Sequence, residues 1–318
     1  MEVDQMITQS ADLNPTSSDL IQRFKEDLKL SDIVSISEYI NRTTEFCAFL
    51  EARESSPLKL TKEDLRSFLI QLKERNLKSA TIDRFFTCLS AFYEFLIVEE
   101  LVEFNPILPF RKYYFRKYKN SNDSEIRKLI EVEDAARLVN SILDSRDKCI
   151  LVLFFKTGMR LGELLSLDVG DIDLERGEIT LKPTKKRSNR VLYIDNEAVA
   201  VLSRWLSARK NRPGSDGSAL FINKRGGRIS KASVEKMTRK HAERVGLYDA
   251  NSGKLEDKFT PHCCRHWFVT HLIRSGMSRD FVKELRGDVR GEAIDIYNHI
   301  DKKELRESYL AHIPQLGV

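Results

Sequence analysis

The sequence predicts a mainly α-helical chain with a small antiparallel β-sheet, an α+β fold divided between two domains. Its 318 residues exceed the usual size of one compact domain. Apolar residues recur at helical spacing through most of the chain, and short strand-like runs occur only between residues 172 and 194. We expect a flexible N-terminal tail over residues 1–17, a helical bundle over 18–105, a linker over 106–128 and a second domain over 129–318.

Four amphipathic helices are predicted in the first domain, because its apolar residues recur at helical spacing. Thr61 followed by Asp64 fits a capping box, which marks the start of the third helix. The apolar stripes are Ile21, Phe24 and Leu28; Ile36 to Leu50; Leu65, Phe68, Leu69 and Leu72; and Ile82, Phe85, Phe86, Leu89, Phe92, Tyr93 and Leu96. Short helices with brief connections pack as a small bundle.

A basic and aromatic stretch follows the bundle and is predicted to link the two domains. It begins at Pro106, has no apolar period and ends in the polar residues 120–123. Cations interleaved with aromatic residues suit a segment that lies along phosphates, and a solvated charged loop explains them equally well. The candidate DNA-binding cations are Arg111, Lys112, Arg116, Lys117 and Lys119.

The second domain begins with two predicted helices and then changes character. Short β-like runs, separated by Gly177 and by a basic turn, predict a small antiparallel sheet. Ser275 and Gly276 provide a stop for the helix before them. The predicted helices span residues 131–143, 148–155, 196–207, 233–245, 261–274, 280–285 and 302–314, and the strands span 172–174, 178–181 and 191–194.

The composition is that of a folded protein in water, with 41% hydrophobic and 32% charged residues. No apolar run approaches the ~18 residues that span a bilayer. The start of the chain also lacks the layout of a secretion signal, so we expect a cytoplasmic protein. Five cysteines within apolar segments favour reduced thiols. The net charge of +5 is too modest to indicate a nucleic-acid partner by itself.

One arginine lies among residues that are typical of a protein core. Arg160 follows shortly after Gly158, between an apolar helix and an amphipathic turn. A guanidinium in such surroundings needs an anionic partner. Glu163, three residues further on, can supply it as a local ion pair. Judged alone, the segment favours that structural pair.

Two histidines and a second arginine share one face at the start of a predicted helix. A threonine cap and a proline at the first helical position precede them. His262, Arg265 and His266 therefore project from the same side of a helix N-terminus, where anions are favoured. This favours a phosphate-sized ligand. A zinc site with Cys263 and Cys264 is a rival, although adjacent cysteines on a helix diverge, and an ordinary pair of surface histidines is another.

A basic hairpin and a tyrosine complete the set of candidates. The turn between the second and third predicted strands is surrounded by Lys182, Lys185, Lys186, Arg187 and Arg190. This tip is either solvated surface or a device that enters a DNA groove and delivers one lysine to a backbone oxygen. Tyr297 lies among the polar residues 295–301. Alone, it indicates core or interface packing.

Together, these segments resemble the tyrosine recombinase (phage integrase) family, in their order and approximate spacing over nearly the whole chain. Thr157-Gly158-Met159-Arg160 with Glu163-Leu164 resembles the first arginine box, and His262-x-x-Arg265-His266 resembles the second. Lys185, five residues before Arg190, is similar to the lysine of the family's β-hairpin, and Tyr297-Asn298-His299-Ile300 resembles the nucleophile box. The residues around 287–289 and 297–301 look like those of archaeal integrases.

The resemblance implies a helical, SAM-like core-binding domain, then a catalytic domain, with no metal and no other cofactor. The catalytic residues it implies are Arg160, Lys185, His262, Arg265, His266 and Tyr297. The two arginines would bind the scissile phosphate and stabilise its transition state. The first histidine would assist proton removal from the tyrosine, and the second would contact the phosphate or support Arg265. The lysine would protonate the departing 5′ oxygen.

The sequence departs from the family pattern after Gly287. Histidine or tryptophan usually follows this glycine, whereas here the residue is Asp288. We expect Asp288 to orient one of the catalytic cations; the alternative is an enzyme without that contact. Lys186 can replace Lys185 as the hairpin lysine, and Glu163 is expected to be a structural support.

The resemblance further implies double-stranded DNA as the partner and a homotetramer on two DNA sites, assembled from a chain that can be a monomer in solution. Lys186, Arg187 and Arg190 are candidate DNA contacts. The helix expected over residues 302–314 suits docking on a neighbouring subunit or packing on its own domain. The function implied is site-specific recombination, for integration and excision or for dimer resolution. The rivals are an inactive DNA-binding protein of this fold, a type IB topoisomerase and a metal-dependent nuclease.

Overall fold

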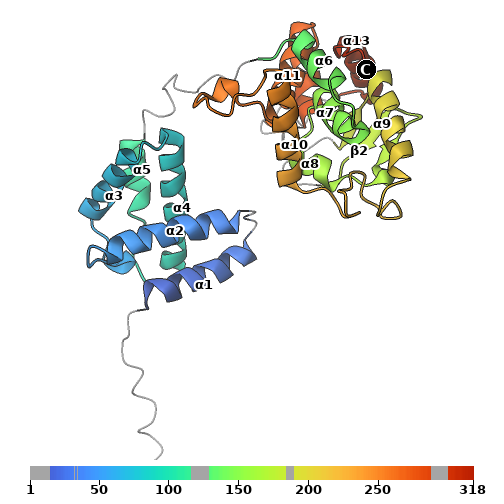
Figure 1. The fold of residues 1–318 in the computed structure, drawn as a ribbon. Coiled ribbons are helices and arrows are strands. Elements are labelled where there is room, and N and C mark those ends of the chain that lie inside the picture. Colours follow the sequence, from blue (N-terminus) through green and yellow to red (C-terminus); the bar gives the residue numbers. More distant parts are fainter. Residues whose placement is uncertain (1–14, 32, 34, 116–128, 184–189, 288–299) are drawn as a thin grey trace, which may run out of the picture. The chain divides into compact units, whose positions relative to one another are not determined.

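The computed structural model describes residues 15–31, 33, 35–115, 129–183, 190–287 and 300–318 (Figure 1). These residues belong to two compact units, which divide the chain between Ser124 and Glu125. Each unit has its own hydrophobic core. The fold is mainly helical with a small antiparallel sheet, as predicted.

The first unit contains α1 (Ser17–Leu30), α2 (Ile36–Glu51), α3 (Lys62–Glu74), α4 (Ser79–Val98) and α5 (Ile107–Tyr114), with the 3₁₀ turn η1 (Pro57–Lys59). α4 packs against α1, α2, α3 and α5. Its Phe86 and Phe92 are fully buried, because this helix is apolar on almost every side. The predicted capping box is present at α3, where Thr61 Oγ1 accepts a hydrogen bond from the backbone N–H of Asp64 at 3.1 Å.

Helix α5 corrects the predicted start of the linker, because residues 107–114 are packed into the first unit. Asn105 Oδ1 accepts a hydrogen bond from the backbone N–H of Ile107 at 2.9 Å, and Asn105 Nδ2 donates to Ser90 O on α4 at 3.0 Å. Ile107 and Phe110, three residues apart, are buried against α4. The basic residues between the apolar ones hid this helical period. Residues 116–128 of the expected linker lie outside the described residues.

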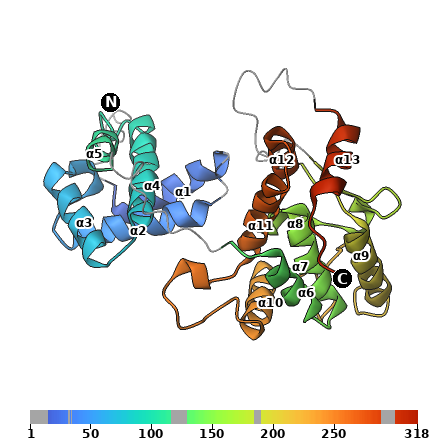
Figure 2. The same cartoon turned by 90° about the horizontal axis from the view of Figure 1, so that it is seen from above.

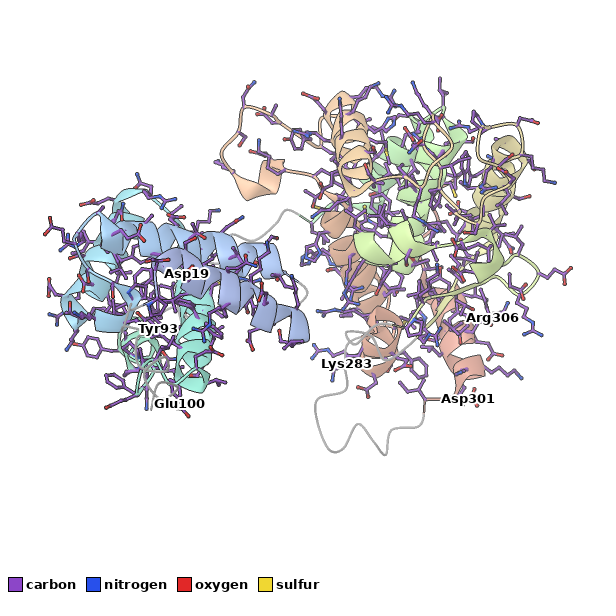
Figure 3. All side chains as sticks on the ribbon, turned by 90° about the horizontal axis from the view of Figure 1, so that it is seen from below. Asp19, Tyr93, Glu100, Lys283, Asp301 and Arg306 are labelled. Carbon is purple, nitrogen blue, oxygen red and sulfur yellow. The ribbon has the colours of Figure 1, made fainter. Side chains whose placement is uncertain are left out.

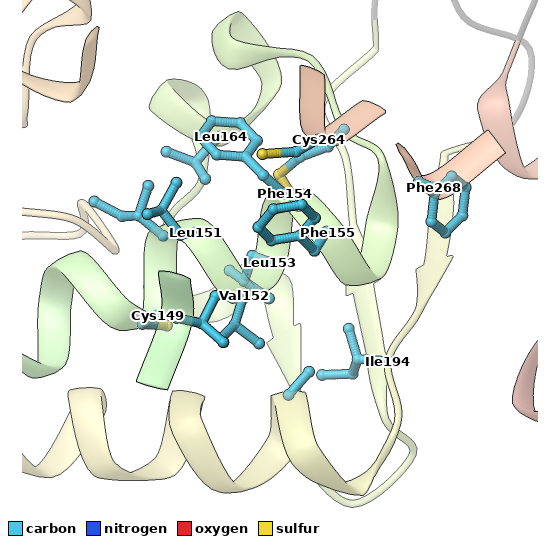
Figure 4. Packing of buried hydrophobic residues seen from close by; sticks show 14 of the residues in the cluster. Cys149, Leu151, Val152, Leu153, Phe154, Phe155, Leu164, Ile194, Cys264 and Phe268 are labelled. Carbon is cyan, nitrogen blue, oxygen red and sulfur yellow. The ribbon is translucent and has the colours of Figure 1, made fainter. Parts of the chain in front are cut away.

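The second unit is built around α7 (Ser145–Thr157), whose residues from Cys149 to Thr157 are all buried. Figures 1 and 2 show α7 between α9 (Asn196–Arg209) and α11 (Pro261–Arg274), and it packs against both. Phe155 of α7 meets the Trp267 ring edge to face at 5.0 Å. Figure 4 shows Cys264 and Phe268 in the same interior. α11 therefore lies directly against the end of α7.

The remaining helices of this unit are α6 (Val132–Asn140), α8 (Leu161–Ser166), α10 (Lys231–Arg244), α12 (Arg279–Arg286) and α13 (Lys302–His312), with the 3₁₀ turns η3 (Val169–Asp171) and η4 (Leu255–Asp257). The strands β1 (Ile172–Asp173), β2 (Glu178–Thr180) and β3 (Val191–Tyr193) form an antiparallel sheet in that order. Ile179 pairs with Leu192 in the β2–β3 register. The predicted sheet is confirmed.

Helix α13 packs on its own unit. Its Leu305 and Tyr309 are buried, and Tyr309 Oη donates a hydrogen bond to Lys156 O on α7 at 2.9 Å. Of the two alternatives for this helix, packing on its own domain is the one seen in this chain.

Cys47, Cys88, Cys149, Cys263 and Cys264 are buried free thiols. Within the described parts of the chain, no helix is both long and apolar enough to span a bilayer.

Candidate active site

The turn between α7 and α8 sets the position of the first predicted arginine. Gly158 ends α7 in the left-handed conformation, with φ of 58°, and its N–H bonds to Phe154 O. A Cβ at this position would come within 2.5 Å of the Phe268 ring on α11. Glycine is therefore required both by the backbone angle and by the close approach of α11. Arg160 follows as the N-cap residue of α8.

Arg160 is held by the carboxylate that the sequence suggested. Its Nη1 lies 3.0 Å from Glu163 Oε1, and its backbone N–H donates to Glu163 Oε2 at 2.7 Å. Glu163 is only 7% exposed, whereas 36% of the Arg160 side chain is exposed. Glu163 thus fixes the first turn of α8, while the guanidinium reaches toward solvent.

The second predicted box opens α11. Thr260 is the N-cap residue and Pro261 occupies the first helical position, as expected from the sequence. The rings of His262 and His266 lie one turn apart, edge to face, with their centroids 4.6 Å apart. Both histidines are exposed, whereas Arg265 is 7% exposed.

Arg265 joins the ends of two other helices. Its Nη1 donates to Gly158 O at the end of α7, at 2.7 Å, and its Nη2 donates to Arg286 O at the end of α12, at 2.9 Å. Gly287 then ends α12 with φ of 66°. The second box therefore holds the chain two residues before Arg160. This contact couples the positions of Arg160 and Arg265, although 105 positions separate them in the sequence.

Arg160, His262 and Arg265 line one cleft with a volume of about 510 Å³. Lys231 and Glu235 of α10 also line it and approach each other to 3.8 Å. The guanidinium groups of Arg160 and Arg265 and the ammonium group of Lys231 outnumber the one carboxylate of this lining, Glu235, so the cleft suits an anion of phosphate size. His266 is not among the lining residues, and it contacts the cleft through the ring of His262.

The arrangement of α11 does not fit the zinc alternative. Cys263 Sγ points back to Lys258 O at 3.7 Å, and Cys264 is fully buried, with its pKa raised by burial. The two histidines instead lie on the exposed side of the helix. In the described portion of the chain, no group of three or more His, Cys, Asp or Glu side chains is placed to hold a metal ion.

The base of the β2–β3 hairpin is described, whereas Lys185, Lys186 and Arg187 lie outside the described residues. Arg190 Nε donates to Leu181 O at 2.9 Å. Arg190, which is predicted to contact DNA, therefore also forms a hydrogen bond across the base of the hairpin.

Sequence reasoning missed the anchor of Lys182, whose Nζ lies 2.6 Å from Asp168 Oδ2. Hydrogen bonds from Lys182 and Arg228 hold the pKa of Asp168 at about 2. Asp168 lies two residues after the end of α8, and Lys231 of the cleft is the first residue of α10. Neither residue lies at a sequence spacing that would link it to the segments of Arg160 or His262, so the sequence did not predict their place near the site.

Tyr297 and Asp288 also lie outside the described residues, but the elements on either side are well anchored. Gly287 ends α12, and Asp301 caps α13 by accepting the backbone N–H groups of the first turn at 2.7 and 3.0 Å. Figure 3 labels Asp301, at the start of α13, and Arg306, on this helix. Arg306 Nη2 donates to a carbonyl oxygen of the β1–β2 turn at 2.8 Å.

The two described candidates for DNA contact in α5 differ. Arg111 bonds to Asp83 on α4 at 2.9 Å and is half-buried, whereas Lys112 is exposed. Arg116, Lys117 and Lys119 lie outside the described residues.

Two family models match the chain. The phage integrase family matches residues 121–304, and the phage integrase N-terminal SAM-like domain matches residues 21–100. The tyrosine recombinase XerC of Thermodesulfovibrio yellowstonii is 30% identical over 285 residues, which cover 86% of this chain and 88% of that protein.

Solved structures share the fold. The Tn1549 transposon integrase with circular intermediate DNA has 19% identity and a TM-score of 0.64 over 91% of this chain and 98% of that chain. The XerH site-specific recombinase bound to its difH substrate has 21% identity and a TM-score of 0.62 over 92% of this chain and 84% of that chain. With the family models and the 30% identical relative, the chain therefore belongs to the tyrosine recombinase (phage integrase) family, and it is a site-specific recombinase that cuts and rejoins DNA.

Proposed function

We propose that this recombinase forms its covalent bond to DNA through Tyr297. The observation that carries the proposal is the single cleft lined by Arg160, His262 and Arg265. A scissile phosphate in this cleft would offer its nonbridging oxygens to both guanidinium groups, which match that geometry with paired hydrogen bonds. Charge that develops in the transition state would meet preorganised donors.

The chemical step follows from the properties of a phenol. A tyrosine hydroxyl has a pKa of about 10, so attack at neutral pH requires a base and nearby positive charge. His262 takes the proton as the Tyr297 oxygen bonds to phosphorus. The bond from phosphorus to the 5′ oxygen breaks, and Lys185 gives that oxygen a proton. The products are a 3′-phosphotyrosyl bond and a free 5′ hydroxyl, and rejoining reverses these transfers.

The remaining residues support this step. His266 positions the His262 ring, which it meets edge to face, or contacts the phosphate itself. Glu163 orients Arg160 through its ion pair. Asp288 orients one of the catalytic cations in place of the family's usual histidine or tryptophan. Lys186 is the alternative to Lys185 as the acid.

The partner in this proposal is double-stranded DNA, bound by four copies of the chain on two sites. The Tn1549 integrase and XerH are both named as complexes with DNA, which supports DNA as the partner. Lys112, Arg116, Lys117 and Lys119, with the hairpin cations, contact the backbone. The free chain can be a monomer in solution, and the proposed place of action is the cytoplasm. Integration, excision and dimer resolution are all compatible with this chemistry, and an archaeal origin stays a prediction.

A nicked suicide substrate tests the proposal. Wild type and Tyr297→Phe are mixed with duplexes that carry candidate sites, in EDTA, and covalent complexes are separated on a denaturing gel. We expect a slowly migrating adduct with the wild type only, because the phenol oxygen is the nucleophile and the arginines supply the charge stabilisation. An authenticated site that is bound by both proteins without any adduct would overturn the proposal in favour of an inactive DNA-binding protein.

A further inference from the structure

Three side chains from two other segments of the chain donate hydrogen bonds to Asp168. Asp168 lies two residues after the end of α8 and accepts hydrogen bonds from Lys182 Nζ at 2.6 Å, from Ser218 Oγ at 3.1 Å and from Arg228 Nη2. Hydrogen bonds from Lys182 and Arg228 lower the pKa of this carboxyl to about 2, so it is charged at neutral pH. A lysine, an arginine and a hydroxyl thus meet at one charged point.

The arginine of this group leads back to the cleft. Arg228 Nη1 donates to Leu165 O at 2.9 Å and to Leu167 O at 2.7 Å. Leu165 belongs to α8 and lines the cleft together with Arg160. The C-terminal end of α8 is therefore tied to Asp168 through Arg228, while Arg160 caps the N-terminal end of the same six-residue helix.

The lysine of this group leads to the hairpin. Lys182 lies two residues after the end of β2 and three residues before Lys185. The neighbouring Leu181 pairs with Arg190 through a backbone hydrogen bond of 2.6 Å and through the Arg190 side chain. The Leu181–Arg190 pair therefore joins the two strands at the described base of the hairpin. The Lys182–Asp168 ion pair connects this base to the segment that follows α8.

We propose that Asp168 is a positioning residue, which sets the β2–β3 hairpin relative to α8 so that the hairpin lysine reaches the departing 5′ oxygen. The proposal rests on the proposed function, in which that lysine is the acid. Displacement of a catalytic group by about 1 Å can cost about 100-fold in rate. Asp168 and Lys182 are both partly exposed, and exposed ion pairs add little to folding stability. Loss of Asp168 is therefore expected to leave the protein folded.

The chemistry of the leaving group separates positioning from a general structural role. With a normal phosphodiester, the 5′ oxygen must gain a proton, because an oxygen anion of this kind is strongly basic. With sulfur at the bridging 5′ position, the phosphorus–sulfur bond breaks to give a thiolate. A thiol has a pKa of about 8.5, whereas that of water is about 15.7. The sulfur substrate therefore needs little help from an acid.

The test compares Asp168→Ala with wild type on both substrates, as single-turnover rates of Tyr297 adduct formation. We expect Asp168→Ala to be ~100-fold slower on the normal substrate and within a few-fold of wild type on the sulfur substrate. Lys182→Met should show the same pattern, as should Lys185→Ala. Glu175→Ala removes an exposed carboxylate of the β1–β2 turn and serves as the matched control, which should match wild type on both substrates.

Two results would overturn the assignment. Equal losses on both substrates mean that Asp168 supports the whole site or the fold, and unchanged rates on the normal substrate mean that it has no positioning role. DNA binding and a melting curve of each variant establish that the protein is folded. A wild type that forms no adduct with either substrate would instead refute the proposed function itself, which distinguishes the two failures.

Discussion

Gly158 is the residue on which the two arginines depend. It must adopt φ of 58°, it must let the Phe268 ring approach, and its carbonyl oxygen accepts the Arg265 guanidinium. A glycine two residues before an arginine indicates a turn in the sequence, but the reason for the glycine comes from α11, more than 100 residues later. The backbone conformation and the packing of α11 therefore both require glycine at position 158.

Replacement of this glycine tests that dependence. Gly158→Ala introduces a Cβ that clashes with Phe268 and strains a left-handed backbone, so we expect a loss of about 1–3 kcal/mol in the free energy of unfolding. Denaturant unfolding measures it. Gly162→Ala is the matched control, because a Cβ at that position meets nothing within 4 Å. Similar stabilities of the two variants would contradict this account.

Elements whose signals are local were predictable, and those defined by distant partners were not. α11 spans Pro261–Arg274 as expected, since its cap, its proline and its Ser275-Gly276 stop are adjacent in sequence. α5 was missed because basic residues interrupt its apolar spacing, and its few apolar residues form a buried face only through contact with α4. In the site, the shared face of His262 and His266 was predictable from helical spacing. The link of Arg265 to Gly158 and that of Asp168 to Lys182 depend on the fold.

Helix α7 contains a buried charge that ties it to α9 and to the end of the chain. Lys156 is fully buried, and its Nζ bonds to Asp195 at 2.5 Å, to Glu197 at 2.6 Å and to Pro314 O at 2.8 Å. The Glu197 carboxylate also accepts backbone N–H groups of residues 316–318. This cluster anchors the segment that follows α13.

Removal of the lysine should leave the buried carboxylate of Asp195 and the partly buried carboxylate of Glu197 without their cationic partner. We expect Lys156→Met to lower the free energy of unfolding by about 3–5 kcal/mol. The triple variant Lys156→Met, Asp195→Asn, Glu197→Gln is the control, because it removes the charges together and should recover much of the loss. Urea unfolding followed by circular dichroism measures both. A single variant as stable as the wild type would show that the cluster contributes nothing.

The same cluster predicts a dependence of stability on pH. Burial raises the pKa of Glu197, but hydrogen bonds from Lys156 and from the backbone outweigh it, and the pKa lies below its ordinary value of 4.5. A carboxyl whose pKa is lowered by folding contributes stability above its unfolded pKa, and this contribution is lost as the pH falls through the folded value. Stability should therefore decline below about pH 4.5, and less steeply in Glu197→Gln.

At the scale of the whole molecule, the chain consists of two units with separate cores and separate sources of positive charge. The second unit gathers arginines around a cleft, whereas the first presents cations along α5. Neighbouring cations of α5 are not equivalent. Arg111 neutralises Asp83, so it is already bonded before any DNA arrives, while Lys112 is exposed. The pairing and exposure of individual cations therefore indicate which of them can contact DNA, and the net charge of +5 does not.

The salt dependence of DNA binding should distinguish these two cations. Each phosphate that a protein cation neutralises adds about 0.9 to the slope of log K against log salt concentration. We expect Lys112→Gln to reduce the slope by about 1, because its ammonium group is available to the backbone. Arg111→Gln should change the slope much less, since it removes a charge that Asp83 already balances. Fluorescence anisotropy across a salt series measures both variants against the wild type on the same duplex. A larger change for Arg111→Gln than for Lys112→Gln would mean that Arg111 leaves Asp83 to bind phosphate, and that helix α5 is used differently on DNA.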